Sequence, residues 1–148
     1  MKPALPAAAQ TAPQPTAYGE PIQLEVAQVI ITAALEAARA ADFRMAFAVV
    51  EPSGELVAFA RMDDVQYASV TLAQDKARSA ARFRQATAVQ EERLMNGRTV
   101  MLALTGAVPV GGGVPIVVDG HVIGAIGVSG ASAGQDHEIA EAGIAALR

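Results

Sequence analysis

The chain of 148 residues contains no cysteine, no tryptophan and only 4% aromatic residues. The absence of cysteine excludes disulfides and thiolate-bound metals. No apolar run approaches the roughly 20 residues that a membrane-spanning helix needs. The net charge of −4 differs from the basic balance of nucleic-acid-binding proteins. We therefore expect one domain of ordinary size, with neither a membrane span nor a nucleic-acid partner.

Apolar residues make up 52% of the chain, and small alanine side chains allow helices to pack closely, as in many homo-oligomers. Four of the eight prolines lie in the first 19 residues. Residues 1–20 are therefore expected to form a disordered Pro/Ala-rich tail and residues 21–148 the folded domain. The tail lacks the apolar region of a signal peptide, which favours a cytoplasmic protein. A periplasmic or secreted location is the alternative if such a peptide was removed.

Hydrophobic periodicity predicts four helices and two β-hairpins. Pro52–Gly54 and Asp119–Gly120 each separate two short apolar runs, as expected of hairpin turns. Residues 100–104 fit either a strand or a buried connection. The order of elements predicts an α+β domain with one antiparallel sheet. The predicted helices cover residues 24–41, 69–83, 87–95 and 139–147, and the predicted strands cover residues 45–51, 56–61, 114–118 and 122–128.

Ten of the 13 glycines lie between residues 106 and 143, among strand-forming valine and isoleucine. Gly124 and Gly127 are three residues apart on a predicted strand, so they lie on opposite faces. We expect a helix close to one face and open space on the other. Gly112 and Gly113 precede a proline-restricted strand, where backbone N–H groups form an anion-binding nest in some proteins. Simple turning of the chain is the alternative interpretation.

Two cationic residues are candidates for binding a carboxylate or phosphate group. Arg61 ends a predicted strand two residues before Asp63, so its guanidinium can hold a planar carboxylate while Asp63 orients the ligand. An ion pair of Arg61 within or between subunits explains the pattern equally well. Lys76 lies within an alanine-rich helix and is a candidate for binding an anion or, if desolvated, for acting as a base. Its spacing favours a solvated basic stripe instead.

Ser129 and Asp136 flank the loop after the last predicted strand and are further candidates for ligand binding, although Asp136 serves equally well as a helix cap. His121 and His137 are the only histidines, and their spacing does not form a metal-ligand pair. Either is a candidate single axial ligand for haem iron, while a surface position is the simpler interpretation. No Ser-His-Asp order or carboxylate pair indicates a particular reaction.

Several stretches, taken in order, carry a family resemblance: Tyr18–Ile22, Arg61–Asp63, Lys76–Arg78, Gly112–Ile116, Gly124–Gly130 and Gln135–Asp136. They resemble the GlcG/HbpS-type haem-binding proteins, a family that includes the carboxy-terminal domain of PduO-type corrinoid adenosyltransferases. The resemblance covers nearly everything from Tyr18 onward and is most specific in the second hairpin. The chain departs from the family pattern at Gln85–Ala86, where Arg-Pro is usual, and at His137, where a small or acidic residue is more frequent.

The resemblance implies a profilin-like single antiparallel sheet of about five strands flanked by helices, and assembly into homo-oligomers. It also implies that haem or a related tetrapyrrole is bound, and that some members degrade haem. On this hypothesis basic residues and the glycine-rich loop hold the ligand's carboxylates. The ligand-binding residues would be Arg61, Asp63, Lys76, Gly112, Gly113 and Ser129.

Two other functions stay open. The first is an enzyme, such as an isomerase, lyase or hydrolase, acting on a small carboxylated or hydroxylated metabolite. Arg61 would bind its substrate, and Asp63 or Lys76 would act as acid or base. The second is a structural or sensing protein whose glycine and alanine faces serve subunit packing alone. The binding hypotheses require Arg61 and Gly113 to line one shared hollow.

Overall fold

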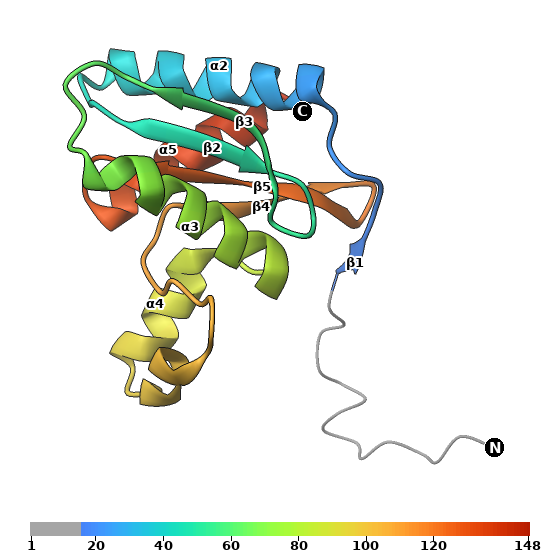
Figure 1. Cartoon of the computed structure of the whole chain (residues 1–148), viewed down its shortest axis with the longest axis vertical. Coiled ribbons are helices and arrows are strands. Elements are labelled where there is room, and N and C mark those ends of the chain that lie inside the picture. The colour runs from blue at the N-terminus through green and yellow to red at the C-terminus, as the bar shows by residue number, and fades with distance from the viewer. Residues whose placement is uncertain (1–15) are drawn as a thin grey trace.

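The computed structural model describes residues 16–148, which form one sheet with helices on both faces (Figure 1). Residues 1–15, most of the expected tail, lie outside the described range. Ala17 and Tyr18, which the expected tail included, form a short strand. In chain order the elements are β1 (Ala17–Tyr18), α2 (Leu24–Ala40), β2 (Ala46–Val50), β3 (Leu56–Arg61), α3 (Ala68–Phe83), α4 (Thr87–Met95), the 3-10 helix η1 (Thr99–Ala103), β4 (Gly113–Val118), β5 (His121–Ser129) and α5 (Ala133–Ala145).

The five strands form a mixed sheet with β5 at its centre. β5 pairs antiparallel with β2 on one side and with β4 on the other, and β2 pairs antiparallel with β3. β1 runs parallel to the start of β5. The α+β class, the five strands and both hairpins are confirmed. The expectation of a purely antiparallel sheet is wrong, because the chain enters the domain alongside β5 in the same direction.

The two faces of the sheet carry different side chains. Helices α2 and α5 pack on one face, and α3 covers the other (Figure 1). Side chains alternate between the faces along each strand, so β2 presents Phe47 and Val49 to α2 and α5, and Ala46 and Ala48 to α3. The core toward α2 and α5 is therefore built from large aliphatic residues, and the core toward α3 almost entirely from alanine.

Gly127 shows how closely α3 lies on the sheet. A Cβ built at Gly127 would overlap the Ala73 carbonyl oxygen of α3 and lie 2.6 Å from the Ala77 nitrogen. The expected helix close to one face is therefore confirmed. The expected open space on the other face is wrong, because a Cβ at Gly124 would overlap the Val50 carbonyl oxygen of β2.

The helix boundaries agree with the sequence except near the carboxyl end. α5 begins six residues earlier than expected, because Ser132 and Gln135 form a capping box. Ser132, not Asp136, is therefore the helix cap. Residues 99–103 form neither a strand nor a buried connection but the 3-10 helix η1, in which Met101 alone is buried.

Candidate functional site

Lys76 lies inside the protein, with its side chain 1% exposed. Its Nζ donates to Asp136 Oδ2 at 2.8 Å and to the Val128 carbonyl oxygen at 3.2 Å. Asp136, 3% exposed, also accepts from the Ala131 N–H at 2.9 Å. The solvated basic stripe that the spacing favours is therefore wrong for Lys76. The ion pair instead joins α3 to the first turn of α5, across the end of β5.

The glycine-rich loop before β4 packs on this ion pair. A Cβ at Gly112 would lie 2.9 Å from the lysine Nζ, and its φ of +133° favours glycine. The Gly113 N–H donates to Thr87 Oγ1 at 2.8 Å, and the Gly111 N–H donates to Glu91 Oε1 at 3.3 Å. Because α4 side chains already accept from these two N–H groups, chain turning and packing account for the glycines.

The electrostatics of the pair are those of an enclosed structural contact. Burial raises the pKa of Asp136, although hydrogen bonds from Lys76 and from the Ala131 N–H oppose this shift. Both side chains are almost completely enclosed by the surrounding protein. The ion pair is therefore a structural contact, and the glycine-rich loop that packs on it is structural as well.

Arg61, the last residue of β3, and Asp63, in the loop that follows, both line two surface hollows. On the α2 side, a hollow of about 500 Å³ is lined by residues 60–64 together with Leu35, Arg39 and Arg44. On the α3 side, a hollow of about 480 Å³ is lined by residues 61–65 and Tyr67.

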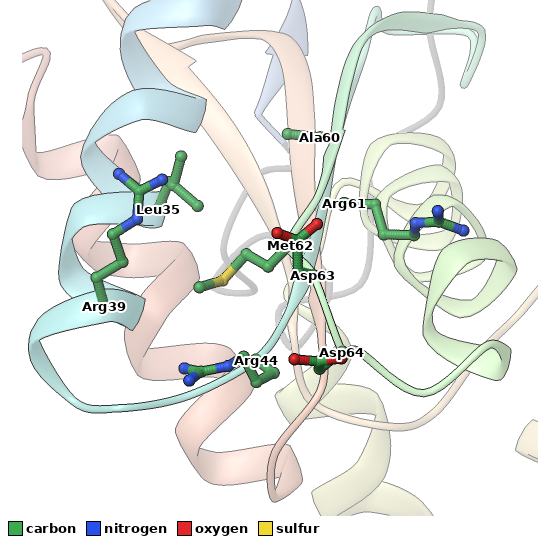
Figure 2. Close-up of a pocket in the computed structure, with 8 residues that line it drawn as sticks. All are labelled: Leu35, Arg39, Arg44, Ala60, Arg61, Met62, Asp63 and Asp64. Atoms are coloured by element: carbon green, nitrogen blue, oxygen red, sulfur yellow. The ribbon is translucent and has the colours of Figure 1, made fainter.

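The Arg61 side chain points away from Leu35, Arg39 and Arg44 (Figure 2). The sheet register explains this direction, because Arg61 pairs with Ala46, which faces α3. Neither of the two hollows that Arg61 lines includes Lys76, Gly112 or Gly113. The structure thus brings Arg61 and Asp63 together, but it places the lysine and the glycines in a separate buried cluster.

Ser129 lies level with Arg61, because both residues pair with Ala46 from opposite sides of β2. Ser129 is 2% exposed, and its hydroxyl donates to Ser69 Oγ at 3.1 Å. Gln66 Nε2 donates to the same oxygen at 3.1 Å. These bonds tie the end of β5 to the start of α3, so the described contacts of the Ser129 hydroxyl are internal.

His137 lies in the first turn of α5, next to Asp136. Its Nε2 is 3.6 Å from Glu141 Oε1, one turn further along the helix. Its Nδ1 is buried and has no hydrogen-bond partner among residues 16–148. An iron ion would have to displace the glutamate or enter a buried space, so His137 fits the role of axial ligand poorly.

His121, unlike His137, is exposed, and it is the first residue of β5. Its Nδ1 is 2.9 Å from the Asp119 carbonyl oxygen. Because a carbonyl oxygen can only accept, Nδ1 carries the proton in the neutral imidazole, and the Nε2 lone pair is then free. Histidine ligands of metals commonly have one ring nitrogen fixed in this way. His121 lines an open hollow of about 560 Å³ together with Tyr18, Val118 and Ile123.

The length of β5 separates His121 from Arg61. His121 begins β5, while Ser129, which is level with Arg61, ends it. A rise of about 3.3 Å per residue places the two ends of the strand roughly 26 Å apart. One tetrapyrrole therefore cannot contact both His121 and Arg61 of the same chain.

Two kinds of feature are absent from the residues that the structure describes. Between residues 16 and 148, no three histidine, aspartate or glutamate side chains gather in a group that could hold a metal ion. No helix in that range combines the length and apolar character needed to cross a membrane.

Comparison with known proteins agrees with the fold and covers nearly all of the domain. The family model of HbpS-like haem-degrading proteins matches residues 22–145. The chain belongs to the HbpS-like family. One HbpS-like relative, the protein GlcG of Escherichia coli K12, is 41% identical over 105 residues, which are 71% of this chain and 78% of the relative.

Solved HbpS-like structures share the architecture. A double mutant of HbpS from Streptomyces reticuli is 27% identical, with a TM-score of 0.81, and the match covers 100% of this chain and 98% of that one. A haem complex of PduOC is 28% identical, with a TM-score of 0.77 over 85% of this chain and 94% of that one. The family resemblance drawn from the sequence is therefore confirmed.

Sequence reasoning missed Tyr18, Arg39 and Arg44 as lining residues. Tyr18 lies in a conspicuous Tyr-Gly-Glu-Pro stretch, but only the parallel pairing of β1 with β5 brings it beside His121. Arg39 lies in the last turn of α2 and Arg44 precedes β2, and nothing in their spacing places them opposite the loop after β3. That proximity depends on how α2 crosses the sheet.

Proposed function

We propose that this chain binds haem or a related tetrapyrrole, with His121 Nε2 as the iron ligand. The single observation that carries the proposal is the contact of His121 Nδ1 with the Asp119 carbonyl oxygen, which in the neutral imidazole leaves the Nε2 lone pair for the metal. The similarity to the haem complex of PduOC supports the same class of ligand.

The hollow beside His121 combines apolar side chains with the acidic residues Glu20 and Asp119. Val118, Ile123 and the Tyr18 ring line the same hollow. The Tyr18 hydroxyl donates to the carbonyl oxygens of Ala81 and Arg82 at 2.8 and 3.0 Å, which fixes the ring against the end of α3. The chain's role is to hold and orient the ligand, while bound haem supplies a redox-active iron.

Arg84 is the cation that we assign to a ligand carboxylate. Its guanidinium carbon lies 5.1 Å from the centre of the Tyr18 ring, and Nη1 donates to the Thr16 carbonyl oxygen at 2.9 Å. Arg61 lies at the opposite end of the sheet, and Lys76 is enclosed in its ion pair. Binding of carboxylates by Arg61, Lys76 and Gly112–Gly113 stays a prediction without support from the described contacts.

Haem titration of the purified chain tests the proposal. We expect a saturable Soret band that differs from that of free haem. His121→Ala should abolish this shift because the iron loses its ligand, and His137→Ala, the matched control, should retain it. If the wild-type chain gives only the spectrum of free haem, the function is refuted. If His137→Ala abolishes the shift and His121→Ala does not, the function stands and the assigned ligand is wrong.

Assembly into homo-oligomers also stays a proposal. Large apolar side chains are exposed around α4 and η1, and Met95 and Leu102 are 78% and 70% exposed. Exposed apolar surface of this kind marks protein interfaces in many soluble proteins. The cytoplasmic location stays an expectation from the sequence, with a periplasmic or secreted location as its alternative. An enzymatic function stays the alternative to tetrapyrrole binding.

A further inference from the structure

The hollow on the α2 side of the β3–α3 loop lies at the opposite end of the sheet from His121. Figure 2 shows Arg39 and Arg44 on the α2 side of the loop, with the Met62 side chain extending toward them. The volume of this hollow, about 500 Å³, falls within the range of small-molecule sites. Two guanidinium groups in one hollow provide donors for a carboxylate.

The side chains around this hollow are held by the chain itself. Arg44 Nη1 donates to Asp42 Oδ1 at 3.3 Å and to the Phe43 carbonyl oxygen at 3.4 Å. Met62 Sδ accepts from the Met45 N–H at 3.4 Å. The bond from Met45 holds Met62 in place, whereas the pair of Arg44 with Asp42 is exposed to solvent, so a ligand carboxylate would compete with Asp42 for this arginine.

The backbone on both sides of the hollow is strained. Asp42 and Asp64 have φ values of +58° and +66°, in the left-handed region that few residues other than glycine adopt. At Asp42 this conformation belongs to the turn that ends α2, in which the Phe43 N–H donates to the Ala38 carbonyl oxygen at 2.9 Å. The two conformations shape the turn before β2 and the loop after β3.

The lining groups define the chemistry of a ligand. Arg39 and Arg44 supply donors for an anion, whereas Asp63 and Asp64 supply acceptors and exclude a second negative charge next to them. Leu35, Ala60 and Met62 contribute apolar surface to the same hollow. A ligand that satisfies all three kinds of surface combines a carboxylate, a donor group and a short aliphatic chain.

We propose that this hollow binds a small aliphatic carboxylate that carries a hydroxyl or ammonium group. Figure 2 draws the Arg39 and Arg44 guanidinium groups apart, on either side of the Met62 side chain. The carboxylate is bound by one of these two arginines, the donor group by Asp63 or Asp64, and the aliphatic part contacts Leu35 and Met62. This binding does not depend on the proposed haem function, because the two hollows lie at opposite ends of β5.

Three acids with one carbon skeleton test the proposal by NMR titration of the backbone amides of the full chain. These are leucine, 2-hydroxy-4-methylpentanoate and 4-methylpentanoate. We expect saturable shifts at residues 60–64 with at least one of the first two acids, and at least tenfold weaker binding of the third, which lacks a donor group. No saturable shift with any of the acids, or equal binding of all three, overturns the proposal.

Variants locate the binding site. Arg39→Gln combined with Arg44→Gln should weaken binding at least tenfold, and Asp63→Asn combined with Asp64→Asn should remove the preference over 4-methylpentanoate. Arg98→Gln, at an exposed arginine of the α4–η1 segment, is the matched control and should bind like the wild type. Unchanged binding by the double arginine variant, with an unchanged melting temperature, overturns the proposal. His121→Ala should bind these acids normally, so failure here is distinguishable from failure of the haem proposal.

Discussion

The face of the sheet that meets α2 and α5 and the face that meets α3 are packed on different principles. On the first face, Phe47, Val49, Ile126 and Val128 fill a deep layer between sheet and helices. On the second face alanines and Gly127 leave so little depth that the α3 backbone itself contacts the strands. The first face can adjust by changing rotamers, whereas the second has almost no side-chain atoms that can move.

The face of the sheet that meets α3, called the shallow face below, also contains the only buried Lys–Asp pair of residues 16–148. Close approach of α3 places the Lys76 nitrogen within reach of Val128 on β5 and Asp136 on α5. A deeper core of large side chains would have separated these groups. The comparison indicates that the α3 face depends on backbone contact and one ion pair, while the α2–α5 face depends on apolar volume.

The largest expected effect follows from adding volume to the shallow face. Gly127→Val would place side-chain atoms on the Ala73 carbonyl oxygen and near the Ala77 nitrogen. Because backbone cannot move aside as a side chain can, we expect a loss of about 5 kcal/mol in the free energy of unfolding, or failure to fold. Urea denaturation measures the loss.

Two variants make this effect specific to the α3 face. Ile126→Val changes the adjacent residue on the opposite face, which is fully buried, and should cost only about 1 kcal/mol. Gly134→Ala adds a Cβ in α5, where nothing lies within 4 Å, and should leave stability unchanged or raise it by up to about 1 kcal/mol. If Gly127→Val lost no more free energy of unfolding than Ile126→Val, the two faces of the sheet would not differ in how they tolerate a change of volume.

The next largest effect is expected when the ion pair is broken. Lys76→Met keeps most of the buried volume but leaves Asp136 without its cation, so we expect a loss of about 3–4 kcal/mol in the free energy of unfolding. Arg78→Met is the matched control in the same helix. It removes a half-exposed pair with Asp75 and should cost less than about 1 kcal/mol. Equal losses in the two variants would show that burial does not matter for Lys76.

The smallest effect is a dependence of stability on pH that comes from Asp136. Burial raises its pKa above the ordinary value of 3.8, so the folded chain binds this proton more readily than the unfolded chain does. Its contribution to stability is then fully present below the ordinary value and is lost as the pH rises through the raised value. Each pKa unit of difference corresponds to about 1.4 kcal/mol.

Urea denaturation of the wild type and of Asp136→Asn at several pH values measures this contribution. The free energy of unfolding of the wild type minus that of the variant should decrease as the pH rises from acid toward neutral, and then level off. A difference that increases with pH would mean that the hydrogen bonds from Lys76 and Ala131 outweigh burial.

Local patterns in the sequence predicted most of the elements. The apolar stripe of α2, the turn residues of both hairpins and the alanine face of α3 each depend on residues close together in the chain, so their structure follows from short-range preferences. The apolar pattern with Asp136 as cap starts α5 too late, because the helix begins at the Ser132–Gln135 capping box upstream of it. The direction of β1 could not be predicted, because two residues carry no directional pattern.

The candidate site was predicted less well, because its contacts join residues that lie far apart in the chain. Lys76 resembles other solvated lysines of a helix, and only the approach of α5 and the glycine-rich loop encloses it. His121 and His137 are equivalent in the sequence. A hydrogen bond to the Asp119 carbonyl oxygen in one case, and proximity to Glu141 in the other, distinguish the two histidines.

The sequence by itself determined the class of fold, the family, the hairpins and the closeness of α3 to the sheet, because each depends on periodicity, turn residues or small side chains that neighbours in the chain supply. Only the tertiary structure decided which charged groups are enclosed, which histidine has an available nitrogen and which arginines share a hollow. These properties depend on residues far apart in the chain, and burial and hydrogen bonding among them are set when the helices pack on the sheet.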